Sequence, residues 1–446
     1  METNMTEGKP FGIILRFTVP LFLGNMFQQL YNMIDSVIVG KYVGANALAA
    51  VGSTGTIFFL VIGLAMGMAS GFTVMTSQYF GANDADGVRY SVTNGIMMSV
   101  IVSAVLTAVS IAVMPTLLSL MHTPTEIFDD AHRYITIICA GTVAIIFYNL
   151  FSSFMRAIGN SRLPLYFLIF SAGTNVVLDL LFIVVFHWGV AGAAWATVIA
   201  QGLAGILCAC YTFTKIEVLR PTKKHWHMRR QCYTKQLAIG IPMSLETGIT
   251  ASGTIVMQSA VNIYGATAVA GFTAASKIIM LLTQGLMSIG QTMASYAGQN
   301  FGAARLDRIS RGVKAAMLLN VVYSVTTATV GWLFFEQVIS IFFSADTILA
   351  DVLPWARTYY LECAVFFIPL GMIFIFRSTI QGCGYGVHAM LMGTLELLGR
   401  VALAIISMKV GSFALACGAD PAAWLLAGIF GVFLYLYMMK KEGAGA

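Results

Sequence analysis

The chain has 446 residues, of which 58% are hydrophobic and only 10% are charged, and its mean hydropathy is +0.82. Soluble globular domains carry roughly 25% charged residues, so this composition excludes a water-covered surface. The apolar residues come in runs of about 20 or more, the length of a helix that crosses a ~30 Å hydrocarbon core. A β-barrel would show alternating segments of ~10 residues instead. We therefore expect an all-α integral membrane protein.

About twelve membrane spans are predicted in chain order. The first apolar run contains Asp35 and is too long for the apolar region of a signal peptide, so we expect it to remain as a functional helix. The predicted spans lie at roughly residues 12–40, 46–76, 90–114, 130–153, 163–186, 189–213, 234–262, 266–297, 310–335, 350–376, 382–408 and 414–439.

Lys and Arg are concentrated in the connectors on one side of these spans, and the other side holds only Lys41, Arg133, Arg357 and Lys409. Cytoplasmic loops carry the excess of basic residues. We therefore expect both termini and the loop at 215–235 to be cytoplasmic, in the cell membrane. The loop is interpreted as a topology signal and linker, with a lipid-head-group or nucleic-acid patch as the alternative. The net charge of +6 is explained by such connectors and does not indicate nucleic-acid binding.

The sequence repeats itself at an offset of 221 residues. KYVGANALAAVG, which begins at Lys41, resembles NIYGATAVAGFT, which begins at Asn262. SQYFGA, which begins at Ser77, resembles GQNFGA, which begins at Gly298. Two halves of six spans each enter the membrane in the same direction, an arrangement typical of transporters with a central cavity.

This repeat predicts two lobes. We expect an N-terminal lobe over residues 1–214, a basic cytoplasmic linker over 215–233 and a C-terminal lobe over 234–446.

Charged residues inside spans mark candidate functional sites. Each costs at least ~2.5–3.5 kcal/mol at the centre of a bilayer on insertion scales. Seven charged residues that fall inside the predicted spans are taken as candidates: Asp35, Asp179, Glu246, Lys277, Glu362, Glu396 and Arg400.

Four oxygen-bearing side chains of the first half are expected at one depth. Asn175 and Asp179 lie four residues apart, so they share a face of the fifth span. Asp179 and Thr197 each lie ~12–13 Å below the turn that joins their spans, at 1.5 Å per residue, and Asp35 lies at a similar depth. Such a set suits a hard cation such as Na⁺, or a carboxylate pair that shares a proton. For Asn175 and Thr197 alone, interhelical hydrogen bonding is the alternative.

The second half differs at the equivalent positions. The offset of 221 places Glu396 at the position of Asn175, and Arg400 at that of Asp179. Glu396 and Arg400 lie in the favourable order for a helical ion pair. Either they form a structural pair, or this half has lost an ion site and closed it with an internal counter-ion.

The sequence resembles the multidrug and toxic compound extrusion (MATE) exporters. The resemblance rests on QQLYNMIDSVIVG in the first span, the GANALAAVG run after it, the fifth-span N-x-x-x-D and the paired halves, and it covers essentially the whole chain. It implies a V-shaped pair of lobes that alternate between inward-facing and outward-facing states. It also implies Na⁺ or H⁺ binding at Asp35, Asn175, Asp179 and Thr197, and export of organic cations.

The C-terminal half carries further candidates. In NorM-like members, acids lie in the seventh and tenth spans, and the resemblance places Glu246 and Glu362 there. Lys277 belongs to the same set of polar residues, together with Glu396 and Arg400. Tyr31, one turn before Asp35, is a candidate aromatic contact for a lipophilic cation.

We therefore expect a monomeric exporter of small lipophilic cations, in contact with membrane lipids and without a cofactor other than its coupling ion. A flippase for lipid-linked precursors is the alternative, but its cavity would need several basic residues, and the seven in-span candidates comprise five acids and two bases. No HExxH, Walker A or suitably placed GxSxG motif indicates an enzyme. Two inequivalent halves do not form the symmetric filter of a channel.

Overall fold

The structure is a computed structural model that describes residues 3–121, 123–343 and 349–444. Throughout those residues the regular structure is helical: long α-helices joined by short turns, one π-helix and two short 3₁₀-helices. The predicted all-α membrane fold is confirmed. Eight helices are long and apolar enough to cross a membrane, or eleven if each of three bent pairs counts as one span. The remaining predicted span corresponds to α8 (Arg230–Asn262), which is long enough to cross but more polar.

The chain folds into two compact units. Unit 1 comprises the residues up to Asn4 and Leu23–Gly248, and unit 2 comprises Met5–Phe22 and the residues from Ile249 onward. The helices α1 (Pro10–Tyr42) and α8 therefore each divide their residues between the units. The boundaries of the units fall inside these two helices and not at the 215–233 loop. The correspondence of the units to the two lobes of the repeat stays a prediction.

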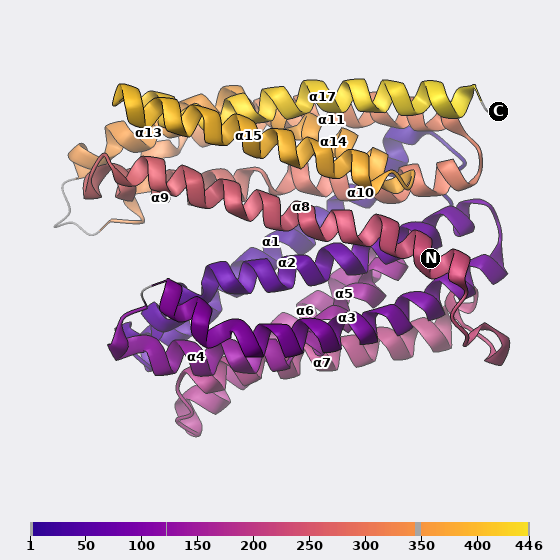
Figure 1. Cartoon of the computed structure of the whole chain (residues 1–446), viewed down its shortest axis with the longest axis horizontal. Helices are drawn as coiled ribbons and strands as arrows, with labels where there is room; N and C mark the ends of the chain where they lie inside the picture. Colours follow the sequence, from indigo (N-terminus) through magenta and orange to yellow (C-terminus); the bar gives the residue numbers. More distant parts are fainter. Residues whose placement is uncertain (1–2, 122, 344–348, 445–446) are drawn as a thin grey trace. The chain divides into compact units, whose positions relative to one another are not determined.

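Among the described residues, unit 1 also contains nine elements that lie wholly within it (Figure 1). They are α2 (Ala45–Gly81), α3 (Ala85–Leu120), α4 (Thr125–Ala140), α5 (Thr142–Ala157), α6 (Arg162–Asp179), the π-helix η1 (Leu180–Val185), α7 (Val190–Lys215) and the 3₁₀-helices η2 (Glu217–Leu219) and η3 (Lys223–His225).

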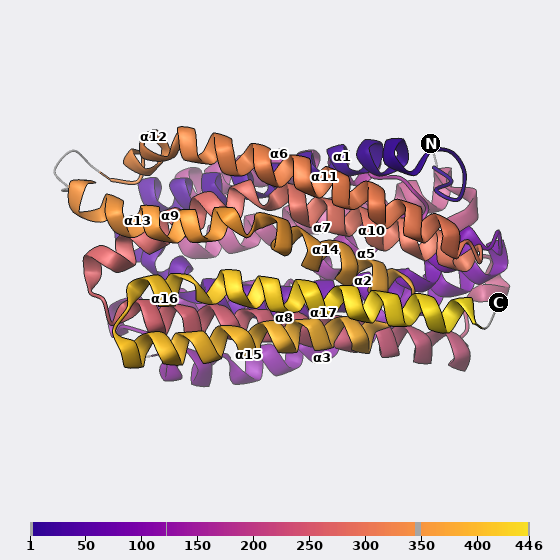
Figure 2. The same cartoon turned by 90° about the horizontal axis from the view of Figure 1, so that it is seen from above.

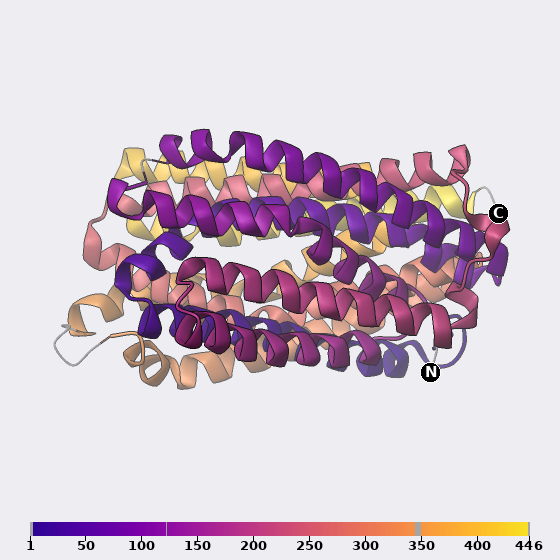
Figure 3. The ribbon, with the colours of Figure 1, turned by 90° about the horizontal axis from the view of Figure 1, so that it is seen from below.

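Within unit 1, α2 packs against α3, α4 and α5, and α7 packs against α4, α5 and α6. Figure 3 shows the same helices in purple and magenta, running alongside one another. Two clusters of buried apolar side chains fill the space between them. One cluster includes Ile135 of α4 and Ala194 of α7, and the other includes Phe154 of α5 and Cys208 of α7.

Unit 2 contains nine further helices (Figure 2). They are α9 (Ala266–Leu282), α10 (Gln284–Gly302), α11 (Leu306–Leu333), α12 (Phe335–Ser340), α13 (Leu349–Val365), α14 (Phe367–Gly382), α15 (Gly386–Val410), α16 (Phe413–Cys417) and α17 (Ala419–Gly443). The helix α14 packs against α10, α11 and α17, while α15 packs against α17 and α9 packs against α13. One large apolar cluster, centred on residues such as Tyr296, Phe367 and Ile380, forms the core of this unit.

Four spans predicted as continuous are broken or altered. The pairs α4–α5, α9–α10 and α13–α14 bend by 47°, 41° and 51°. The first bend occurs at Gly141, where a Cβ atom would lie 2.2 Å from Val198 of α7, so glycine is what permits that approach. The fifth predicted span changes from α-helix to π-helix directly after Asp179.

A row of glycines on α2 brings its backbone against α8 within unit 1. Gly63, Gly67 and Gly71 lie four residues apart and therefore on one face. A Cβ atom on Gly71 would lie 2.3 Å from the Cα atom of Gly240, and one on Gly67 would lie 2.7 Å from that of Ser244. Small residues at such spacing let membrane helices pack backbone to backbone. This contact fixes the first part of α8 in unit 1.

Candidate functional site

The structure gathers the predicted ion-site residues of unit 1 from three helices. Tyr31 and Asp35 come from the part of α1 that belongs to this unit, Asn175 and Asp179 from α6, and Thr197 from α7. Asp179 is fully buried and Asn175 is 1% exposed. The spacing of four residues along α6 places its amide and its carboxylate on the same buried face, as predicted.

The Thr197 hydroxyl connects the three helices. The Asn175 side-chain amide donates a hydrogen bond to Thr197 Oγ1 over 3.3 Å. The Tyr31 and Thr197 hydroxyl groups lie 3.3 Å apart in a second hydrogen bond. One neutral side chain on α7 thereby orients an amide on α6 and a phenol on α1.

Four acceptor oxygens at this site lack a donor. They are Asp35 Oδ1, Asn175 Oδ1 and both carboxylate oxygens of Asp179, which are buried without a hydrogen-bond partner among the described residues. The two carboxyl groups also lie close enough to influence each other's charge. Buried polar atoms are normally paired, because an unpaired one loses its hydration without compensation. A proton or a cation bound here would compensate these oxygens.

The donor set fits either species. Carboxylate, amide and hydroxyl oxygens are the ligands of a hard cation, and Asp35, Asn175, Asp179 and Thr197 supply all three kinds. Two neighbouring carboxylates also favour the uptake of one shared proton, because like charges oppose double ionisation.

The π-helix η1 begins at the residue after Asp179. The wider turn of a π-helix rotates the following residues relative to an ideal α-helix, and such segments occur frequently at functional sites. The carboxylate thus lies where the hydrogen-bond ladder of the span changes. The apolar run Leu180–Val185 gives no sequence signal for this change.

Tyr134 of α4 is a site neighbour that sequence reasoning missed. Its buried phenol interacts electrostatically with Asp35, Asp179 and Tyr31. It adds a fourth helix to the site. Tyr134 lies in a span of mixed composition with no motif around it, so no signal in the sequence could have identified it.

The polar residues predicted for the second half do not form one cluster. Glu246 is buried on the part of α8 that belongs to unit 1. Glu362 is partly buried on α13, close to Gly418, whereas Lys277 is exposed on α9. Their proposed participation in ion or cargo binding stays a prediction.

The predicted ion pair between Glu396 and Arg400 is confirmed, with Arg400 Nη2 2.8 Å from Glu396 Oε1. A second acid, Asp420 of α17, accepts a hydrogen bond from Arg400 Nε over 2.6 Å. Asp420 was missed. Its position inside the span predicted at 414–439 is the signal that would have found it.

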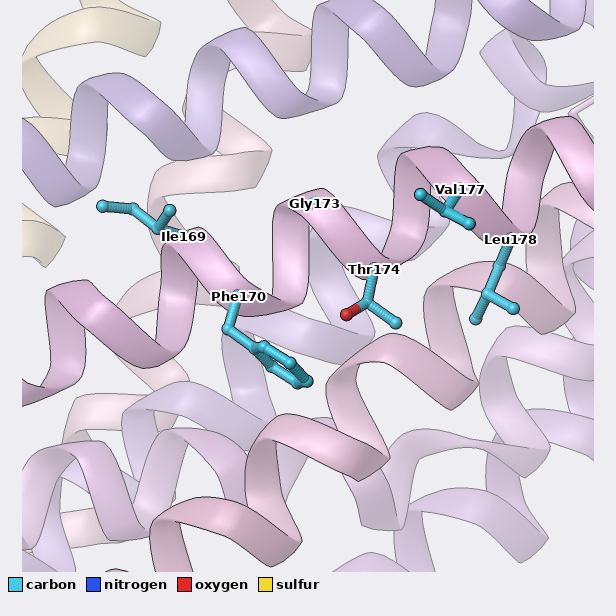
Figure 4. A pocket seen from close by; sticks show the side chains of 6 residues that line it. All are labelled: Ile169, Phe170, Gly173, Thr174, Val177 and Leu178. Carbon is cyan, nitrogen blue, oxygen red and sulfur yellow. The ribbon is translucent and has the colours of Figure 1, made fainter.

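A shallow apolar depression lies along α6 on a different face from the ion-site residues (Figure 4). Among the residues labelled there, Thr174 alone has an oxygen atom in its side chain. Ile169, Phe170 and Val177 are exposed. With one hydroxyl and a lining from a single helix, this depression lacks the converging polar groups of a binding site.

A helical membrane bundle that buries carboxylate oxygens without hydrogen-bond donors is typical of membrane transporters. The sequence matches the MatE family over residues 20–181 and 242–418. The chain therefore belongs to the MatE family of multi-pass membrane multidrug efflux transporters.

Individual comparisons agree with this assignment. The probable multidrug resistance protein YpnP of Bacillus subtilis (strain 168) is 27% identical over 383 residues, which cover 85% of this chain and 84% of the relative. The multidrug export protein MepA of Staphylococcus haemolyticus is 22% identical over 87% of this chain and 86% of its own length. The crystal structure of a MATE protein in complex with MaL6 has the same fold, with a TM-score of 0.92, 22% identity and 99% of both chains covered.

Proposed function

We propose that this chain is a secondary active exporter that exchanges inward-moving Na⁺ or H⁺ for lipophilic organic cations by alternating access. It acts as a monomer in the cell membrane, with both termini and the 215–235 loop in the cytoplasm. The coupling ion binds at Asp35, Asn175, Asp179 and Thr197. No other cofactor takes part.

One observation carries this proposal: four buried acceptor oxygens of Asp35, Asn175 and Asp179 have no donor among the described residues. Unpaired acids within a membrane span are costly. A bound cation or proton removes that cost, and its occupancy depends on the ion concentration outside. Through such a site, an ion gradient changes the relative populations of two conformational states of the protein.

The charge at the site supports a cationic cargo. The described groups that act on the charges of Asp35 and Asp179 include no Lys or Arg. An organic cation is attracted to these acids when the coupling ion has left, and Tyr31 supplies an aromatic surface nearby. A flippase for lipid-linked pyrophosphates would need basic residues here, so that alternative is not favoured. The multidrug names of the relatives YpnP and MepA support a drug cargo.

The test is efflux of ethidium from proteoliposomes that contain the purified protein. A Na⁺ gradient and a pH gradient are imposed separately, so that each ion is assayed alone. We expect one of the two gradients to drive efflux. Absence of efflux under both gradients, across a panel of cationic dyes, would contradict the proposal.

Variants of the two acids test whether gradient-driven efflux depends on this site. Asp35→Asn and Asp179→Asn each remove one charge while retaining the shape, and we expect gradient-driven efflux to collapse in both. Asp129→Asn, which changes an exposed acid of α4, is the matched control and should transport normally. Ion-driven efflux that persists in the Asp35→Asn/Asp179→Asn double variant would disprove the assignment of the site.

A further inference from the structure

Unit 2 contains a buried guanidinium held by two acids from different helices. Arg400 of α15 is 5% exposed. Its Nε donates to Asp420 Oδ1 over 2.6 Å and its Nη2 donates to Glu396 Oε1 over 2.8 Å. The Tyr359 hydroxyl donates to the other oxygen of Asp420 over 2.7 Å. The guanidinium is thus held by acids from α15 and α17, and a phenol from α13 donates a hydrogen bond to one of these acids.

A glycine on α8 makes the space that the guanidinium occupies. A Cβ atom on Gly253 would lie 2.3 Å from Arg400 Nη1 and 3.3 Å from its Cζ. A Cβ atom at this position therefore requires the guanidinium to shift. The backbone of α8 therefore forms one wall of a compartment shaped to a planar cation.

The repeat relates this compartment to the ion site of unit 1. The offset of 221 residues places Arg400 at the position of Asp179 and Glu396 at that of Asn175. It places Asp420 two residues beyond the position of Thr197, at residue 199 of the first half. Gly253 falls within one turn of the position equivalent to Asp35. In unit 1 these helix positions hold acceptor oxygens that have no donor in the described part of the chain. In unit 2 the equivalent positions hold the guanidinium of Arg400 together with the acids that accept its hydrogen bonds.

We propose that unit 2 holds a second cation site, permanently filled by the guanidinium of Arg400, and that a small planar cation of the guanidinium class binds there once this side chain is removed. Arginine remains protonated at all physiological pH values, so the filled site exchanges no ion. The inference rests on the proposed function in one respect: with this site filled, the coupling ion exchanges at the acceptors of unit 1 that have no donor among the described residues. Arg400 is then the residue that prevents the equivalent position of unit 2 from exchanging an ion.

The charged side chains around the compartment leave it with little net charge when the guanidinium of Arg400 occupies it. The carboxylates of Asp420 and Glu396 face Arg400 directly, and Arg377 Nη1 lies 3.9 Å from the second oxygen of Glu396. Removing Arg400 alone leaves Asp420 with the phenol of Tyr359 as its remaining described donor. The vacated compartment therefore carries excess negative charge and attracts a cation of matching shape.

Chemical rescue tests this proposal. Purified Arg400→Ala should unfold at a lower temperature than the unmodified protein, and low millimolar guanidinium or methylguanidinium should restore much of the difference. The same additions should not raise the unfolding temperature of the unmodified protein. Guanidinium and methylguanidinium should also not raise the unfolding temperature of Arg400→Ala/Asp420→Asn, because this double variant lacks the charge of the main acid of the compartment. Arg357→Ala removes an exposed arginine that pairs with Glu336, and guanidinium should not rescue it.

A second measurement remains informative if Arg400→Ala does not fold. Lysine retains the charge but lacks the Nη1 branch, so Gly253→Ala should lower the unfolding temperature less in Arg400→Lys than in the unmodified protein. Equal effects of Gly253→Ala in both backgrounds, or guanidinium effects of the same size in Arg400→Ala and its Asp420→Asn double variant, would overturn the proposal. Neither measurement involves transport, so each outcome is independent of whether Asp35 and Asp179 couple efflux.

Discussion

At the scale of single residues, Thr197 connects the helices of the candidate ion site although it carries no charge. Its hydroxyl accepts a hydrogen bond from Asn175 and bonds to Tyr31. It therefore fixes the orientation of an amide whose oxygen is itself one of the buried acceptors without a partner among the described residues. Its position on α7, a different helix from Asp35 and Asp179, makes the geometry of the site depend on packing among three helices.

Replacing Thr197 with valine should weaken ion binding without removing a charge. Valine matches the shape of threonine but leaves the Asn175 amide without its acceptor, and one hydrogen bond contributes about 0.5–1.5 kcal/mol. We expect a loss in ion affinity of roughly 2- to 10-fold, measured as the ion concentration that half-saturates efflux. Thr197→Ser retains the hydroxyl and should behave like the unmodified protein. If serine and valine reduce the affinity equally, the hydroxyl has no role in the site.

At the scale of helices, the glycine row on α2 sets the position of α8 in unit 1. Beside the backbone approach at Gly67 and Gly71, the Ser244 hydroxyl donates to the Leu64 carbonyl over 2.6 Å. The Gln236 amide donates to the Phe72 carbonyl over 3.1 Å. Each of these polar contacts requires the close approach that glycine permits.

Gly71→Ala should therefore destabilise the protein even though alanine favours helices. The new methyl group would meet the α8 backbone at 2.3 Å, and overpacking of this kind costs typically ~1–3 kcal/mol. Gly55→Ala changes a glycine of the same helix with open space around it, and should be neutral or slightly stabilising. Thermal unfolding in detergent measures both. Equal unfolding temperatures for the two variants would show that the α2–α8 approach tolerates a side chain.

The beginning of α1 is tied to unit 2 by a buried arginine of α11. Arg308 is 5% exposed, and its Nε donates to Asn300 Oδ1 over 3.0 Å. Its two other nitrogens donate to the backbone carbonyls of Met5, Glu7 and Gly8, each over 3.0 Å. The segment that leads into the first helix is therefore held by one planar guanidinium, which has five N–H donors.

Arg308→Gln should lower the stability by on the order of 3 kcal/mol, because several buried carbonyl groups lose their donor. Arg311→Gln provides the matched control: this arginine lies on the same helix but is 58% exposed in a surface pair with Asp307, and such pairs contribute ~0–1 kcal/mol. The two unfolding temperatures should differ clearly. A drop of the same size in both variants would show that charge, and not the buried hydrogen bonds, accounts for the loss.

The features of the fold that could be predicted are those that follow from composition and from the spacing of residues along a helix. Apolar runs marked the spans, and the four-residue spacing of Asn175 and Asp179 placed both on one face. The bends at Thr283 and Phe366 were not predictable, because neither residue breaks a helix by its own conformational preference. The contacts of Tyr134 were not predictable either, since they depend on which helices pack together. Such features belong to tertiary packing, which a single sequence does not display.

At the scale of the whole molecule, the proposed coupling ion and the proposed cargo carry charge of the same sign. In the proposed exchange the acids of unit 1 attract both cations, whereas the acids around Arg400 already accept hydrogen bonds from its guanidinium. An exchanger requires that occupancy by one cation disfavours occupancy by the other. The coupling free energy between two ligands is reciprocal by thermodynamic necessity, so this antagonism must be measurable from either side.

We therefore expect the coupling ion to weaken dye binding to the purified protein, and the dye to weaken ion binding by the same factor. Typical coupling free energies of ~1–3 kcal/mol correspond to about 5- to 150-fold. Fluorescence titrations of ethidium at increasing concentrations of the ion that drives efflux give the first factor, and ion titrations at fixed dye give the second. In the Asp35→Asn/Asp179→Asn double variant the ion should no longer change the affinity for the dye, because the site that senses it has lost its charge. Dye binding that is independent of the ion in the unmodified protein would contradict exchange through a shared negative site.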